Sequence, residues 1–215
     1  MVNQPIEPHV KPLDFRAREA INMLRGTVQM AGYQTNVFAV TSALAHEGKS
    51  SLAFRLAQSL AALEGKVDIY LPDLKYLDGT VAARYSTAPD YPAVATAAIR
   101  EMVRQVGPVQ LDENGILQKG VIIRHLILPG QLPGARAVMD WVAETFQPGE
   151  VLFSLMSQYT PMPGLTGFPE LSARIDAELN GRLIHYMSVR HLSGYWQDTA
   201  SATADIIPDF DGTGT

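Results

Sequence analysis

The sequence predicts an α/β fold in which helices pack on a layered parallel sheet, and three observations lead to this prediction. Short apolar runs rich in β-branched residues alternate with stretches whose apolar residues recur every three or four positions. Such alternation of strands and helices is typical of a parallel sheet. Hydrophobic residues make up 47% of the 215 residues, which is enough for a buried core. Glycines and prolines fall between the runs, where the chain is expected to turn.

The first part of the chain predicts a strand, a loop and a helix in that order. Residues 1–15 contain three prolines and little periodicity, so we expect an extended arm. Apolar residues recur at helical spacing over residues 15–30, and the run VFAVT at 37–41 predicts a strand. A loop at 42–49 then precedes a strong helical pattern over 50–63. This is the order of elements that a phosphate-binding loop requires.

The middle of the chain predicts two further strands on either side of a helix. Residues 67–71 read as a buried strand, and 91–106 as an amphipathic helix that begins near Pro92. An Asn-Gly pair within 112–120 predicts a hairpin turn that leads into an apolar strand at 121–128.

The last part continues the same alternation. We expect a helix at 136–146, a buried strand at 151–156 and a helical stretch at 170–189. The polar tail, residues 201–215, is expected on the surface.

Composition excludes several classes of site. The sequence contains no cysteine, which excludes disulfides, thiol nucleophiles and thiolate-bound metals or iron–sulfur clusters. A net charge of -5 argues against a nucleic-acid-binding surface. No run of about 18 apolar residues predicts a membrane span, and the first residues do not resemble a signal peptide, so we expect a cytoplasmic protein.

The loop before the second predicted helix has the residue types of a nucleotide site. In AVTSALAHEGKSS, backbone N–H groups and the helix N-terminus can face a phosphate, Lys49 can meet a β- or γ-phosphate, and Ser50 can hold magnesium. Ala43 stands where the usual pattern has its first glycine. The alternative is a helix-capping serine beside a solvated lysine. The candidate nucleotide-binding residues are Glu47, Gly48, Lys49, Ser50 and Ser51.

Residues 15–66 resemble the P-loop domain of bacterial tyrosine kinases of the capsule and exopolysaccharide type. The loop TSALAHEGKS fits that family, in which the first glycine is not required, and the resemblance implies Mg-ATP as a ligand. Two departures count against kinase activity. Asn22 replaces the central arginine of the family's ring-assembly helix, and Leu71 stands where the family has a magnesium-positioning aspartate. An isobutyl group can neither bind magnesium nor accept a proton.

Residues 67–215 resemble a second family. The motifs VDIYLPDLKYLD, GVIIRHLILPG, SLMSQYTPM and FPELSARI, in this order, are similar to radical-SAM iron–sulfur proteins related to the pyruvate formate-lyase activating enzyme. The resemblance implies the C-terminal half of a partial TIM-like barrel. It also implies that Asp73, Lys75 and Arg124 bind S-adenosylmethionine.

The chemistry of these three residues suits that ligand. Asp73 can accept from hydroxyl or amino groups, while Lys75 and Arg124 can hold a carboxylate. His125, Gln158 and Tyr159 are expected at neighbouring strand ends and could line the same cavity. The alternatives are structural: a surface pair for Asp73 and Lys75, an ion-pair partner for Arg124, and, as the favoured interpretation, a core histidine for His125.

The motif that holds the iron–sulfur cluster in the second family is missing from this sequence. The family's CxxxCxxC motif, which holds an iron–sulfur cluster, lies in the half that the kinase-like segment replaces, so no cluster is expected here. No catalytic residue is assigned, and whether the chain is an enzyme stays open. His185 and His191 are six residues apart, which does not place them on one helix face as a metal site.

Three hypotheses follow for a chain divided at residues 66 and 67. The first is a catalytically incomplete radical-SAM homologue that at most binds S-adenosylmethionine. The second is a P-loop module that binds ATP, and the third is a recombinant chimera without a selected function. The expected partners are small molecules, S-adenosylmethionine or a nucleotide, and not nucleic acid.

Overall fold

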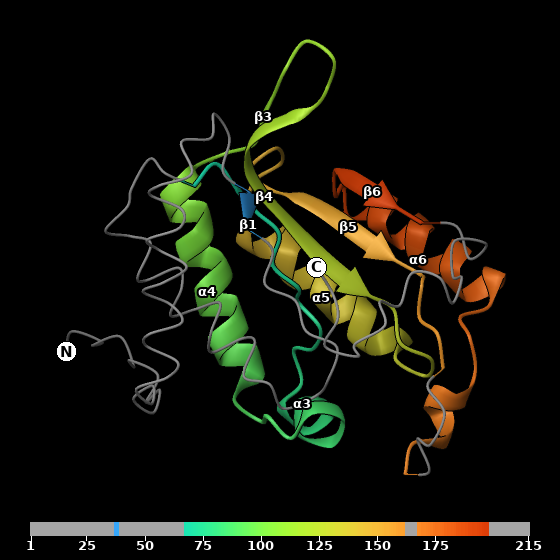
Figure 1. The fold of residues 1–215 in the computed structure, drawn as a ribbon. Coiled ribbons are helices and arrows are strands. Elements are labelled where there is room, and N and C mark those ends of the chain that lie inside the picture. The colour runs from blue at the N-terminus through green and yellow to red at the C-terminus, as the bar shows by residue number, and fades with distance from the viewer. Residues whose placement is uncertain (1–36, 39–66, 162–166, 198–215) are drawn as a thin grey trace, which may run out of the picture.

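The computed structural model describes residues 37–38, 67–161 and 167–197. Over these residues the chain forms a six-stranded sheet with helices packed against it (Figure 1). The strands are β1 Val37–Phe38, β2 Ile69–Tyr70, β3 Gln110–Leu111, β4 Leu117–Leu126, β5 Leu152–Met156 and β6 Gly194–Trp196. The helices are α3 Gly79–Ser86, α4 Tyr91–Val106, α5 Leu132–Thr145, the short 3-10 helix η2 Pro169–Ser172, and α6 Ala177–Val189.

The sheet is parallel along its main path, which confirms the predicted α/β fold class. The strand order is β1-β2-β4-β5-β6, and each neighbouring pair on this path is parallel. Strand β3 lies off the path and pairs antiparallel with β4. Val37 of β1 lies in register with Ile69 of β2, so one sheet contains strands from both sides of the predicted division at residues 66 and 67.

Strand β4 shows why the helices gather on one face of the sheet. Its side chains alternate, so that Val121, Ile123 and His125 are buried while the residues between them are partly exposed. The buried residues of β4 and β5 share one core with α4, α5 and α6. Full burial of one aliphatic or aromatic side chain stabilises a fold by about 1.5–3 kcal/mol. The fully buried side chains include Leu74, Ile99, Ile123, Ile127, Met139, Phe153, Leu155 and Leu183.

Helix α4 has the bounds that the sequence predicts, residues 91–106. Pro92 lies in its first turn, where the missing N–H costs no hydrogen bond. One stripe of the helix is buried, including Ile99 and Met102, and the helix ends at Gly107, whose φ of 73° few other residues adopt. The predicted hairpin is also confirmed: Asp112 accepts from the backbone of the Asn-Gly turn and β3 pairs with β4.

Other predicted boundaries are wrong. The helix expected at 170–189 begins at Ala177, because the Asp176 carboxylate caps it by accepting from the Leu179 N–H at 2.7 Å. A 3-10 helix occupies the first part of that range. The helix expected at 136–146 begins earlier, at Leu132, and β4 begins at Leu117 rather than at residue 121.

Two elements have no counterpart in the predictions. Helix α3 is only eight residues long, and its sequence signal is the Asp78 cap, which accepts from the Thr80 N–H. Strand β6 is three residues long and lies against β5 so closely that a Cβ on Gly194 would stand 2.0 Å from the Phe153 carbonyl oxygen. Only glycine permits this approach.

Several predictions lie outside the described residues. These are the helices at 15–30 and 50–63, the nucleotide-binding residues Glu47–Ser51 and the tail at 201–215. The structure therefore does not test the candidate ATP site.

Candidate functional site

The carboxyl ends of the parallel strands meet at one edge of the sheet, which is where open α/β sheets bind ligands. Asp73 follows β2 at this edge and forms an isolated parallel bridge with Arg124 of β4. The Arg124 guanidinium donates to a single oxygen of Asp73, with Nε 2.8 Å and Nη2 2.7 Å from Oδ1. Each side chain is about one-quarter exposed. The structure thus brings together two of the three residues predicted to bind S-adenosylmethionine.

The third predicted residue, Lys75, lies two residues further along the same segment. It borders a small pocket between the ends of β2 and β4 and the helices α3 and α5. Its ammonium has no hydrogen bond or ion pair within the described part of the chain. Asp73 and Arg124 neutralise each other, and the Asp78 carboxylate at the same pocket caps α3. The Lys75 ammonium is therefore the group at this edge that a negatively charged ligand group complements.

The pocket beside Lys75 is mainly apolar. Its cavity volume is about 20 Å³, which is room for about one water molecule. His125 and Gln131 are polar groups on its wall, and Asp78 stands at the start of α3. The residues that line it are Lys75, Tyr76, Leu77, Asp78, Val81, His125, Leu126, Leu128, Gln131, Gly134 and Ala135.

His125 is a core histidine, as the sequence analysis favours. Its side chain is 3% exposed, its ring stacks on Phe153, and its Nδ1 lies 2.8 Å from the Leu74 carbonyl oxygen. Burial lowers the pKa of His125, and the Leu74 carbonyl and the Asp73 charge oppose that shift only in part. A neutral ring with its proton on Nδ1 suits this contact, so His125 ties the segment after β2 to β4.

Gln158 and Tyr159 follow β5 and do not join this pocket. Gln158 accepts a hydrogen bond from the Gln197 side chain at 2.9 Å, and the Tyr159 hydroxyl donates to the Leu171 carbonyl at 2.7 Å. Neither residue borders the pocket beside Lys75 in the part of the chain that the structure describes. The expectation that both line one cavity with His125 is wrong for this pocket, because their polar groups point to the segments after β5 and β6.

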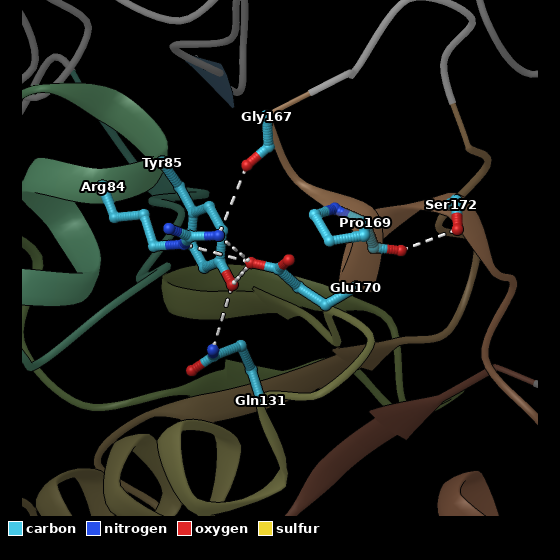
Figure 2. A network of polar contacts seen from close by, with 7 residues as sticks. All are labelled: Arg84, Tyr85, Gln131, Gly167, Pro169, Glu170 and Ser172. Atoms are coloured by element: carbon cyan, nitrogen blue, oxygen red, sulfur yellow. Dashed lines mark hydrogen bonds and ion pairs between the residues drawn. The ribbon is translucent and has the colours of Figure 1, made fainter.

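A second polar cluster, the Arg84 network, consists of Arg84, Tyr85, Gln131 and Glu170 (Figure 2). Glu170 Oε1 accepts from Arg84 Nε and Nη2 at 3.1 and 2.8 Å and from the Tyr85 hydroxyl at 2.8 Å. Gln131 donates to the same hydroxyl at 3.1 Å. These contacts join three separate segments, since the residues come from α3, from the loop before α5 and from η2.

The sequence analysis did not find the Arg84 network. Its hydrogen-bonded partners lie 46 to 86 residues apart in the sequence, and no motif marks them. The pKa of the Glu170 carboxyl is lowered first by its own backbone N–H and then by Tyr85 and Arg84. The Arg84 side chain is 50% exposed, so this network lies at the surface and does not enclose a buried site.

The described residues contain neither a cluster of metal ligands nor a membrane-spanning helix. Within 67–161 and 167–197 no three His, Asp or Glu side chains gather in a way that could hold a metal ion. No helix in these ranges is long and apolar enough to cross a membrane.

The comparisons with known proteins find a likeness among solved structures. No protein-family model matches the chain, and no curated protein does. Among solved structures, the chain is similar to a domain of the pyruvate-formate lyase-activating enzyme from Bacteroides vulgatus ATCC 8482, with a TM-score of 0.45 and 14% sequence identity. The match covers 85% of this chain and 91% of that one. A likeness of this size assigns no role to any residue.

Proposed function

We propose that the edge formed by Asp73, Lys75 and Arg124 binds a small metabolite that carries a carboxylate and hydroxyl groups, with S-adenosylmethionine as the specific candidate. The observation that carries the proposal is the one-sided Asp73–Arg124 pair. Both guanidinium contacts use Oδ1, and Oδ2 has no hydrogen-bond partner among the described residues. Oδ2 is therefore available to accept from a ligand hydroxyl.

The chemistry of the three residues fits this ligand. The Lys75 ammonium can pair with the ligand carboxylate. Arg124 holds Asp73 in place, and the guanidinium N–H groups that do not contact Asp73 can donate to the same carboxylate. An iron–sulfur cluster does not fit, because these 215 residues contain no cysteine to ligate it in the manner of the family they resemble. We therefore propose ligand binding by this chain and derive no cleavage step.

Binding of S-adenosylmethionine, measured by titration calorimetry, tests the proposal. Lys75→Met is expected to weaken binding about tenfold or more, because a charge-assisted hydrogen bond contributes about 1.5–3 kcal/mol. Lys119→Met is the matched control, since Lys119 lies on β4 beside β3, away from the carboxyl edge. Decarboxylated S-adenosylmethionine should bind the unmodified chain and Lys75→Met equally weakly.

Asp73 is tested in the same assay. Asp73→Asn keeps the shape of the side chain but removes the charge that holds Arg124, and it is expected to weaken binding by a similar factor. Glu113→Gln removes a carboxylate from the distant hairpin and should leave binding unchanged. Equal affinities of the unmodified chain, Lys75→Met and Asp73→Asn would overturn the proposed function.

A further inference from the structure

We infer that Tyr91 is a positioning residue for the candidate site, holding Asp73 and Lys75 through their backbone. This inference rests on the proposed function. The Tyr91 hydroxyl donates to the Asp73 carbonyl oxygen at 2.9 Å and accepts from the Lys75 N–H at 2.8 Å. One side chain from the first position of α4 thus bridges the two residues on either side of Leu74.

Alternation of the backbone explains why this bridge is needed. In an extended segment, successive backbone groups point to opposite sides. The Pro72 carbonyl and the Leu74 N–H point to β4, where they pair with the N–H and the carbonyl of Arg124 at 2.8 Å each. The Asp73 carbonyl and the Lys75 N–H point to the other side. There the Tyr91 hydroxyl supplies one donor and one acceptor, as a neighbouring strand would.

Tyr91 is itself held rigidly. Its side chain is 7% exposed, and its ring packs edge-on against Tyr76 with 5.6 Å between the ring centroids. Its backbone N–H donates to the Ala88 carbonyl at 3.0 Å, just before Pro92 begins the helical turn. The hydroxyl is therefore fixed by packing, and it transmits that order to the segment that carries the Asp73 and Lys75 side chains.

His125 holds the same segment from the opposite strand. Its Nδ1 contacts the Leu74 carbonyl oxygen at 2.8 Å. This contact and the backbone hydrogen bonds to Arg124 hold residues 73–75 on the side of β4, and the Tyr91 hydroxyl holds them on the other side. Loss of the Tyr91 hydroxyl would leave the Asp73 carbonyl and the Lys75 N–H without these partners, while the contacts to β4 remain.

Tyr91→Phe tests the inference in the full 215-residue chain, because it removes the hydroxyl and keeps the ring. The affinity for S-adenosylmethionine is expected to fall about threefold to tenfold, which corresponds to loss of about one hydrogen bond's net contribution. Tyr159→Phe is the matched control, since it also removes a hydroxyl that donates to a backbone carbonyl, that of Leu171, but lies outside the pocket beside Lys75. It should leave the affinity unchanged.

Amide hydrogen exchange, resolved by residue, gives a second readout that does not require ligand. In Tyr91→Phe the Lys75 amide should exchange about tenfold faster, while Ile99 and Met102 in α4 keep their protection. Faster exchange throughout α4, an unchanged Lys75 amide, or equal loss of affinity in Tyr91→Phe and Tyr159→Phe would overturn the inference. Absence of binding by the unmodified chain would overturn the proposed function, and the exchange of Lys75 would still decide whether Tyr91 holds this segment.

Discussion

Two polar regions at the same edge of the sheet are built in different ways. The Asp73 loop, residues 72–75, is held by backbone hydrogen bonds to Arg124, by the His125 ring and by a buried hydroxyl. The Arg84 network is held mainly by contacts between side chains, with one long hydrogen bond from Arg84 to the Gly167 carbonyl at 3.4 Å, and Arg84 is half exposed. The first region is anchored in the core, whereas the Arg84–Glu170 ion pair of the second lies at the surface beside the partly buried Tyr85 ring. Contacts of the first kind are the ones that can fix the geometry of a binding site.

The difference arises from what lies between the polar groups. Leu74 is fully buried and separates Asp73 from Lys75, so the segment that presents these two side chains is also part of the core. No member of the Arg84 network is fully buried, and the charges of Arg84 and Glu170 are screened by water and salt.

The largest expected effect is therefore that of Leu74→Ala. Truncation of a fully buried leucine leaves a cavity and is expected to lower the free energy of unfolding by about 2–5 kcal/mol, measured by urea denaturation. Leu77→Ala is the matched control, because Leu77 is only partly buried at the same core. Equal losses in the two variants would show that the Asp73 loop is not anchored more firmly than its surroundings.

An intermediate effect is expected from pH, through His125. Because burial lowers its pKa, the folded chain keeps the ring neutral at a pH where the unfolded chain, with a pKa of about 6.5, takes up a proton. Stability from this group is full above that value and decreases as the pH falls below it. The melting temperature of the unmodified chain should therefore decrease as the pH is lowered from 7.5 to 5.5.

His125→Asn isolates this contribution, because the asparagine amide can donate to the Leu74 carbonyl and does not titrate. The decrease between the two pH values should become smaller in this variant. His185→Asn is the control, since His185 is exposed. If both variants keep the full decrease, the buried ring is not its source.

The smallest effect is expected in the Arg84 network. Glu170→Gln removes the carboxylate that Arg84 and Tyr85 share, and it should lower the melting temperature by less than Leu74→Ala does. High salt should remove the difference between Glu170→Gln and the unmodified chain, because exposed charges are screened. Glu113→Gln serves as a control without such partners among the described residues. A salt-independent loss as large as that of Leu74→Ala would erase the distinction between the two regions.

The sequence predicted most of the fold because its strongest signals are local. Helix α4, the Asn-Gly hairpin and the apolar strands β4 and β5 follow from periodicity and turn residues, and the structure confirms them apart from both ends of β4 and the first residue of β5. The start of α6 was misplaced because residues 170–176 have helical composition, whereas the cap at Asp176 and the 3-10 turn before it decide where the helix begins. Strand β6 is too short to show a period.

In the candidate site, too, some features follow from the sequence and others only from the tertiary structure. Residue types and spacing alone determined that Asp73 and Lys75 follow a buried strand and that Arg124 lies within another. Only the tertiary structure decided that Arg124 uses one oxygen of Asp73, that the Tyr91 hydroxyl replaces a neighbouring strand, and that Gln158 and Tyr159 point elsewhere. The physical reason is that strand and helix periods are set by neighbours in sequence, whereas these contacts join residues 12 to 51 positions apart that meet only when the sheet has formed.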